Sequence, residues 1–357
     1  MKSAQDLLDW FEGNASSFIQ MADEIWANPE TAWKEMHASQ LQAQYLQGEG
    51  FGVAASIAGI PTAFIAEWGK GKPVLGFIGE YDALPGLSQK AVPRRDPVVE
   101  DGPGHGCGHN LLGTGCLAAA VAVKKWLEAN SKEATIRYYG CPAEEGGGAK
   151  AFMARAGVFD DLDAAFNFHP SALNYPCEGS NLSVNHIRFR FHGQAAHAGG
   201  SPHLGRSALD AVELMNVGVN YLREHVTDDV RIHYVITKGG SAPNIVPDEA
   251  EVWYYIRAHL PSDMQAVTER VRKIAQGAAL MTETTWEEIF ESATTCILNN
   301  QVLSDLQYQA MQNIGPIQFT PEEKEFARAV CRQFPTRDIS EILHSLNLTA
   351  EIRGQLE

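Results

Sequence analysis

A short glycine-rich segment carries a thiol and an imidazole two residues apart. Residues 104–110 read GHGCGHN and precede a run of helical periodicity. Because glycine lets the backbone turn sharply, Cys107 and His109 can face one point. A thiolate and an imidazole together suit zinc and other borderline-soft metal ions. Taken alone, the pair is more typical of a glycine-rich turn with a structural cysteine.

Two adjacent carboxylates follow an apolar run further along the chain. The β-rich run 134–140 leads into CPAEEGGG, in which Glu144 and Glu145 precede three glycines. Open α/β sheets place their sites at the carboxyl ends of strands. Adjacent carboxylates there need a positive charge nearby, and one can bind a metal ion while the other takes a proton from water. A solvated acidic turn is the alternative.

Two more predicted strand ends carry groups of the same kind. The segment FNFHP places His169 after a β-rich run that proline stops, and GEYDALP places Glu80 and Asp82 after another run. A core histidine with ordinary hydrogen bonds and a capped turn are the alternatives for these two segments. Four such clusters in one α/β domain point to a shared site rather than to coincidence.

The elements that must position these residues alternate between helix and strand. Helical periodicity and β-rich runs follow one another through residue 168, which predicts an α/β domain with a mostly parallel sheet. The expected helices are 4–26, 33–48, 110–130 and 149–156, and the expected strands are 62–67, 73–80, 134–140 and 164–168.

The pattern changes near residue 181. The order becomes β-α-β-β-α-β, which is the split-βαβ or ferredoxin-like signature. The expected elements are strand 182–192, helix 205–224, strands 230–238 and 250–258, helix 263–280 and strand 283–292. We therefore expect three parts: a first α/β part at 1–180, an inserted domain at 181–296, and a return toward the first part at 297–357.

Six ordered motifs resemble one family, the M20 metallopeptidases, in its amidohydrolase branch. They are GEYDALPG, HGCGHNLLG, CPAEEGGG, NFHP, GQAAHAGGSPHLGRSALDA and PNIVPDEAEVWYYIRA. The branch includes aminoacylase-like and auxin-conjugate-hydrolase-like enzymes, and the resemblance runs from near residue 15 to about 330. It implies a zinc-peptidase-like catalytic domain with a mostly parallel sheet and an inserted ferredoxin-like lid or dimerisation domain.

The resemblance also implies roles in a centre of two divalent metal ions, zinc or manganese. Glu144 would be the general base and acid, and Asp82 would orient a ligating imidazole. Other branches of the family have a ligating histidine where this chain has Glu80, so Glu80 is not expected among the ligands. The expected ligands are Cys107, His109, Glu145 and His169.

Three residues of the inserted domain match family positions that contact substrate. His197 would donate to the scissile carbonyl and its developing oxyanion. Asn244 and Arg257 would hold the substrate carboxylate or the carbonyl, and the fork of an arginine suits a carboxylate. A turn histidine and a strand-end surface arginine are the alternatives for His197 and Arg257.

The resemblance implies hydrolysis of the amide bond of a small N-acyl amino acid, such as p-aminobenzoyl-glutamate. A dipeptidase or an aminoacylase of the same family is the alternative enzyme, and an inactive fragment or partner chain is the alternative from another class. Relatives supply a last ligand, a histidine, from a C-terminal segment. No family motif surrounds His344, so we expect this chain to lack that ligand.

Composition excludes some partners. The net charge is 28 − 44 = −16, which disfavours nucleic acid. No apolar run is long enough to span a membrane, and the N-terminus has no secretory signal. Six scattered cysteines fit a reducing cytoplasm. From the resemblance we expect a homodimer, or a heterodimer with a related chain.

Overall fold

The computed structural model describes residues 4–171, 174–176 and 179–333. Among these, residues 4–175 and 316–333 form one compact unit, and residues 176–315 form a second. The change of unit at 175 lies close to the boundary expected at 180. Helix α7 (Gln301–Ile314) groups with the second unit, although the sequence pattern assigns it to the returning part.

The first unit is built on a five-stranded sheet in the order β1-β2-β4-β3-β5. Strands β3, β4 and β5 are parallel, as the alternating pattern predicts, whereas β1 and β2 run antiparallel. β1 has no counterpart among the expected strands, because four residues are too few for a recognisable pattern. The strands are β1 (Gly52–Ala55), β2 (Phe64–Gly69), β3 (Val74–Glu80), β4 (Thr135–Cys141) and β5 (Ala164–Phe166).

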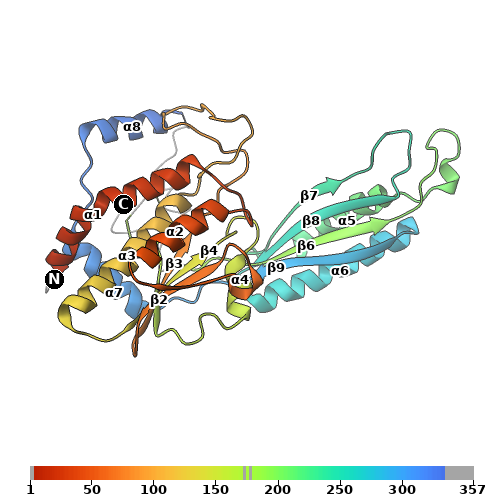
Figure 1. Ribbon diagram of the computed structural model, residues 1–357. Helices are drawn as coiled ribbons and strands as arrows, with labels where there is room; N and C mark the ends of the chain where they lie inside the picture. Colours follow the sequence, from red (N-terminus) through yellow and green to blue (C-terminus); the bar gives the residue numbers. More distant parts are fainter. Residues whose placement is uncertain (1–3, 172–173, 177–178, 334–357) are drawn as a thin grey trace. The chain divides into compact units, whose positions relative to one another are not determined.

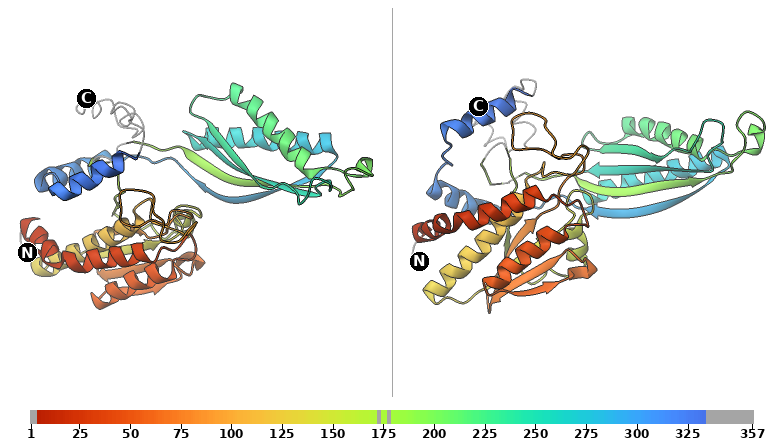
Figure 2. Two further views of the ribbon diagram at one scale, coloured as in Figure 1. Left: turned by 90° about the horizontal axis from the view of Figure 1, so that it is seen from above. Right: turned by 45° about the horizontal axis from the view of Figure 1, so that its top comes forward.

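Helices cover both faces of this sheet. α1 (Ala4–Ala27), α2 (Met36–Gly48) and α3 (His109–Asn130) pack on one face, where Leu117 and Tyr138 are fully buried. The short α4 (Ala149–Arg155) packs on the other face against Tyr139. Successive residues of a strand face opposite sides, so the adjacent tyrosines of β4 serve the two cores. Figure 2 shows the three long helices lying together over the sheet.

The pairing of β3 with β4 decides where their loops emerge. Glu80, the last residue of β3, is directly opposite Cys141, the last residue of β4. Parallel strands that end in register send their following loops out at the same edge. The segments after Glu80 and after Cys141 therefore start side by side, at the edge where α/β folds build their sites.

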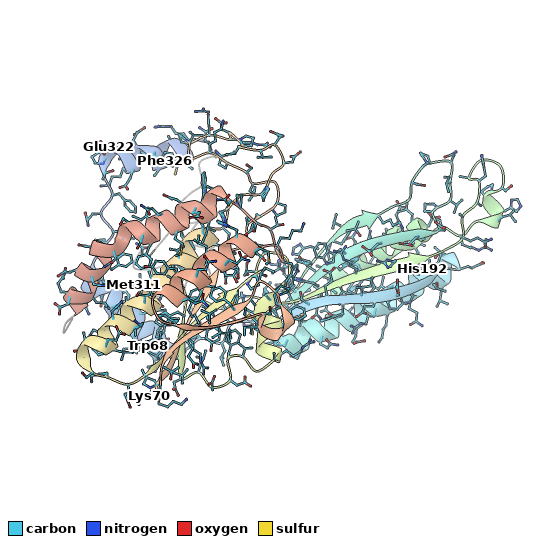
Figure 3. The ribbon with its side chains drawn as sticks, in the orientation of Figure 1. Trp68, Lys70, His192, Met311, Glu322 and Phe326 are labelled. Carbon is cyan, nitrogen blue, oxygen red and sulfur yellow. The ribbon has the colours of Figure 1, made fainter. Side chains whose placement is uncertain are left out.

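The second unit is a four-stranded antiparallel sheet in the order β7-β8-β6-β9. Its elements follow the chain in the order β-α-β-β-α-β, and α5 and α6 pack on one face. Figure 3 labels His192, which lies on the opposite face of β6, 3.2 Å from a carboxylate oxygen of Glu287. The elements are β6 (Ser183–His192), α5 (Ala208–Leu222), β7 (Arg231–Lys238), β8 (Glu249–Ala258), α6 (Pro261–Thr282) and β9 (Thr285–Thr294).

The remaining elements are short. They are the single turns η1 (Ile57–Gly59), η2 (Pro202–Leu204) and η3 (Arg223–His225), and the last helix, α8 (Pro321–Cys331). Within the part of the chain that the structure describes, no helix is both long and apolar enough to cross a membrane. His344 lies outside the described residues.

Candidate metal centre

Two overlapping groups of potential metal ligands share His109. The ligand atoms of Cys107, His109 and His169 all lie within 4.8 Å of one another, and so do those of Glu80, His109 and Glu144. Cys107 Sγ is 3.1 Å from His169 Nε2. The structure thus brings together three of the four ligands expected from the sequence, and it adds Glu80, which the sequence reasoning left out.

Gly108 explains how the thiol and the two imidazoles meet. It precedes α3 with φ +79°, a backbone conformation that glycine adopts without strain. A Cβ at this position would lie 2.8 Å from Cγ of Pro170, so only glycine lets the loop carrying His169 approach so closely. The glycine therefore both turns the chain between Cys107 and His109 and makes room for the third residue.

Asp82 holds two parts of the centre with its two carboxylate oxygens. Oδ1 lies 2.8 Å from His109 Nδ1, and Oδ2 accepts a hydrogen bond of 2.8 Å from the backbone N–H of Glu145. The carboxylate is 1% exposed, so water does not compete for it. Because Nδ1 donates to Asp82, the neutral His109 ring presents the lone pair of Nε2 to the centre. This is the orienting contact expected of Asp82.

Glu80 stands where a metal ligand would stand. Its Oε2 lies 3.1 Å from His109 Nε2, yet neither atom has a hydrogen-bond partner among the described residues, and both are buried. Its other oxygen accepts from Lys150 Nζ at 2.5 Å. A buried polar atom without a partner is costly, and a shared cation would satisfy both atoms. The position before Asp82 thus supplies a carboxylate in place of histidine.

A strained turn presents Glu144 and Glu145. Ala143 has φ +54°, which is rare for a residue other than glycine, and its N–H donates to Glu35 Oε1 at 2.8 Å. Its carbonyl accepts from Gly147 and Gly148, which closes the turn. Glu144 Oε2 then lies 3.9 Å from His109 Nε2, and one buried oxygen of Glu145 has no hydrogen-bond partner among the described residues.

The electrostatics of the centre show an excess of negative charge. Burial, then a hydrogen bond to Glu145 and the charges of the carboxylates, raises the pKa of the Cys107 thiol to about 12. Partial burial and the charge of Glu80 raise the pKa of Glu144. Burial lowers the pKa of His109, but Asp82 and the other carboxylates outweigh it, so that pKa is raised. Each shift reflects carboxylates gathered with little compensating charge.

The donor set fits divalent metal ions. A thiol, imidazoles and carboxylates converge, and three buried atoms of His109, Glu80 and Glu145 lack partners among the residues described. A bound cation would lower the pKa of the thiol and favour its thiolate, which is the form that binds metal. Thiolate and imidazole favour zinc, while the carboxylates also suit manganese.

The second unit places two of its expected site residues on neighbouring loops. His197 Nδ1 accepts hydrogen bonds from the N–H groups of Gly199 and Gly200, at 3.2 and 2.9 Å. The ring proton therefore lies on Nε2, which is free to donate outward from an exposed side chain. The N–H of Ala198 donates to the carbonyl of Asn244 at 3.0 Å, so the two loops lie side by side.

Arg257 lies apart from that pair, near the end of β8. Its guanidinium lies over the ring of Tyr255, 5.7 Å from the ring centroid. It is partly exposed and forms no ion pair with another described residue. An arginine in this state can receive the carboxylate of a ligand.

Comparison with known proteins identifies the family. Residues 76–333 match the model of peptidase family M20/M25/M40. The chain belongs to this family. It is 47% identical over 350 residues to one of the two chains of the p-aminobenzoyl-glutamate hydrolase of Escherichia coli (strain K12), covering 98% of this chain and 73% of that protein. The predictions of an M20 chain and of the amide-hydrolase class are confirmed.

Two other similarities bear on specificity and fold. The Xaa-Arg dipeptidase of Mus musculus is 33% identical over 270 residues, which cover 72% of this chain but only 59% of that protein. A dinuclear metal-binding peptidase of the M20 family from Bacillus subtilis has a solved structure that matches with a TM-score of 0.57 at 22% identity. The match covers 84% of this chain and 80% of that one, and it shows the fold.

Proposed function

We propose that this chain hydrolyses the amide bond of a small N-acyl amino acid, such as p-aminobenzoyl-glutamate, at a centre of two divalent metal ions. The observation that carries the proposal is the buried pair of Glu80 Oε2 and His109 Nε2, 3.1 Å apart without partners among the described residues, with Glu144 beside them. The similar Escherichia coli hydrolase supplies the substrate class.

The ligand set in this proposal extends the one expected from the sequence. Bound divalent ions would act as Lewis acids toward the amide carbonyl and would lower the pKa of a bound water. Metal identity is proposed as zinc, with manganese as the alternative. The residues that would hold the ions are Cys107, His109, Glu145, His169 and Glu80.

Glu144 would move the proton in this mechanism. Its pKa is raised toward the range where a carboxylate is an effective base near neutral pH. It would take a proton from the attacking water and deliver it to the nitrogen of the departing amine, so that the C–N bond breaks without a free anion. Its place beside His109, without a strong ion pair of its own, supports this role.

Residues of the second unit would hold the rest of the substrate. His197, with its proton fixed on Nε2, would donate to the carbonyl oxygen as negative charge develops there. Asn244 and Arg257 would bind the carboxylate of the amino-acid portion. We further propose that this unit is a ferredoxin-like lid or dimerisation domain and that the chain pairs with a copy of itself or with a related chain. The similar Escherichia coli hydrolase has two kinds of chain, and this supports a partner.

A dipeptidase is the second candidate, because the Xaa-Arg dipeptidase is similar over much of this chain. The two candidates differ in the acyl group and share the reaction. A panel of p-aminobenzoyl-glutamate, N-acetyl amino acids and dipeptides ending in arginine separates them by kcat/KM. Preference for the aroyl substrate supports the first, and preference for dipeptides supports the second.

Glu144→Gln tests the catalytic proposal directly. The variant keeps the shape of the side chain but cannot accept a proton, so turnover of p-aminobenzoyl-glutamate should fall by at least about a hundredfold. Metal content, measured by atomic absorption, should stay unchanged. Glu12→Gln, an exposed change on α1, is the matched control. Near-normal turnover in Glu144→Gln would remove this residue from the mechanism.

A further inference from the structure

A cavity of about 840 Å³ opens in the first unit beside the candidate metal centre. Its walls come from Trp26 at the end of α1, from 86–89, from 98–99 and from 103–106. Most of these residues are apolar, and cavities of this size commonly bind small organic ligands. The lining includes Gly106, whose neighbour in the chain is Cys107.

Backbone contacts fix the walls of this cavity. Leu84 and Gly104 exchange two N–H···O hydrogen bonds, at 3.0 and 2.9 Å. A Cβ at Gly104 would lie 2.0 Å from the carbonyl oxygen of Leu87, so glycine is required for the two segments to approach. The cavity is therefore a consequence of how the two segments are joined, and its shape does not depend on a ligand.

The polar side chains of the lining are mostly used inside their own loop. Ser88 Oγ accepts from the N–H of Val99 at 3.0 Å. The amide nitrogen of Gln89 donates to two backbone carbonyls, and its oxygen accepts from the N–H of Asp96. These contacts leave an apolar wall, with His105 as its polar exception.

His105 presents an acceptor that nothing satisfies. Its Nε2 lies 3.2 Å from the carbonyl oxygen of Ile25, and a carbonyl can only accept, so Nε2 carries the proton. In the neutral ring, Nδ1 is then a hydrogen-bond acceptor. Nδ1 is buried and has no partner among the described residues. A buried acceptor in an apolar wall favours a ligand that brings one N–H or O–H group.

We infer that this cavity binds the aromatic acyl end of the substrate and that His105 Nδ1 accepts a hydrogen bond from its amino group. The inference rests on the proposed function, because it takes the p-aminobenzoyl group as the acyl portion. That group is a flat apolar ring with one neutral donor at its far end. The lining offers the matching features: apolar contact from Trp26, Leu87 and Val99, and a single acceptor. His105 is thus a specificity residue.

Binding measurements on the intact, metal-loaded protein test this inference without requiring hydrolysis. Calorimetry compares 4-aminobenzamide, which has the donor, with benzamide, which lacks it. One hydrogen bond should favour the amino compound by roughly five- to tenfold in Kd. In His105→Phe, the ratio should fall to about one while benzamide binds as before. His105→Gln, which restores a carbonyl acceptor, should recover part of the preference, and exposed His225→Phe should leave it unchanged.

A second variant guards against a change that merely disturbs folding. Val99 is 60% exposed at the cavity wall, so Val99→Arg should fold normally while its side chain blocks the cavity and weakens both ligands at least tenfold. Equal binding of the two amides by the unmodified protein, or unchanged binding in Val99→Arg, would overturn the inference. Selective binding without hydrolysis would count against the proposed function alone. Hydrolysis without selective binding would count against the cavity assignment alone.

Discussion

Asp82→Asn should weaken metal binding more than any other conservative change at a residue that does not itself bind the ion. Asp82 accepts hydrogen bonds on both oxygens, from His109 Nδ1 and from the N–H of Glu145, each at 2.8 Å. An asparagine has only one acceptor atom, and its NH₂ group would face one of these two donors. One donor therefore loses its partner in a site that is 1% exposed.

The magnitude follows from those two contacts. Leaving a buried donor unpaired costs about 1–3 kcal/mol of stability. Loss of an orienting partner typically costs about ten- to a hundredfold in metal affinity. The outcome depends on orientation: facing the NH₂ to Glu145 shifts the turn that carries Glu144, whereas facing it to His109 releases the imidazole.

The assay is competition for zinc against a chelating indicator, together with urea unfolding of the same samples. Asp23→Asn, an exposed change on α1, is the matched control and should match the unmodified protein in both. Unchanged zinc affinity in Asp82→Asn, with normal stability, would refute the argument that Asp82 orients His109 and the Glu145 segment.

Three further predictions address other parts of the site. Cys107→Ser should lower the affinity for zinc more than for manganese in direct titrations, because a hydroxyl is a harder and poorer ligand; equal affinities would make Cys107 structural. Arg257→Ala should lower kcat/KM roughly ten- to a hundredfold for substrates with a free α-carboxylate but little for their amides; equal losses would exclude the carboxylate role. Lys150 lowers the pKa of Glu144, so Lys150→Met should raise it and move the acidic limb of the kcat/KM profile to higher pH; an unmoved limb would contradict this coupling.

Long periodic elements were predictable from the sequence because their pattern repeats many times. Helix α3 spans His109–Asn130 where 110–130 was expected, and β3, β4 and β6 begin and end within about a residue of the expected strands. Short elements give too little pattern, which is why β1 was missed. The parallel pairing followed from the alternation of elements, but the antiparallel β1 and β2 depend on tertiary contacts that no local pattern encodes.

The candidate site was predictable where a motif carried it and not where geometry did. Cys107, His109 and His169 are brought together as expected. Glu80 was set aside because relatives have histidine there, although a carboxylate can bind the same ion. The role of Glu35 has no local signal, since the residue whose N–H it binds, Ala143, lies 108 positions away.

Buried carboxylates explain how the centre can be shaped before any ion binds. Glu35 accepts the N–H of Ala143 and Asp82 accepts the N–H of Glu145, so the two residues on either side of Glu144 are anchored independently. Each anchor comes from a different element, and both are at most 1% exposed. The turn that presents Glu144 is thus held by protein contacts, while Glu80 Oε2 and His109 Nε2 keep free lone pairs. A divalent ion can enter such a site at little cost in reorganisation, because the ligands it needs already face one another.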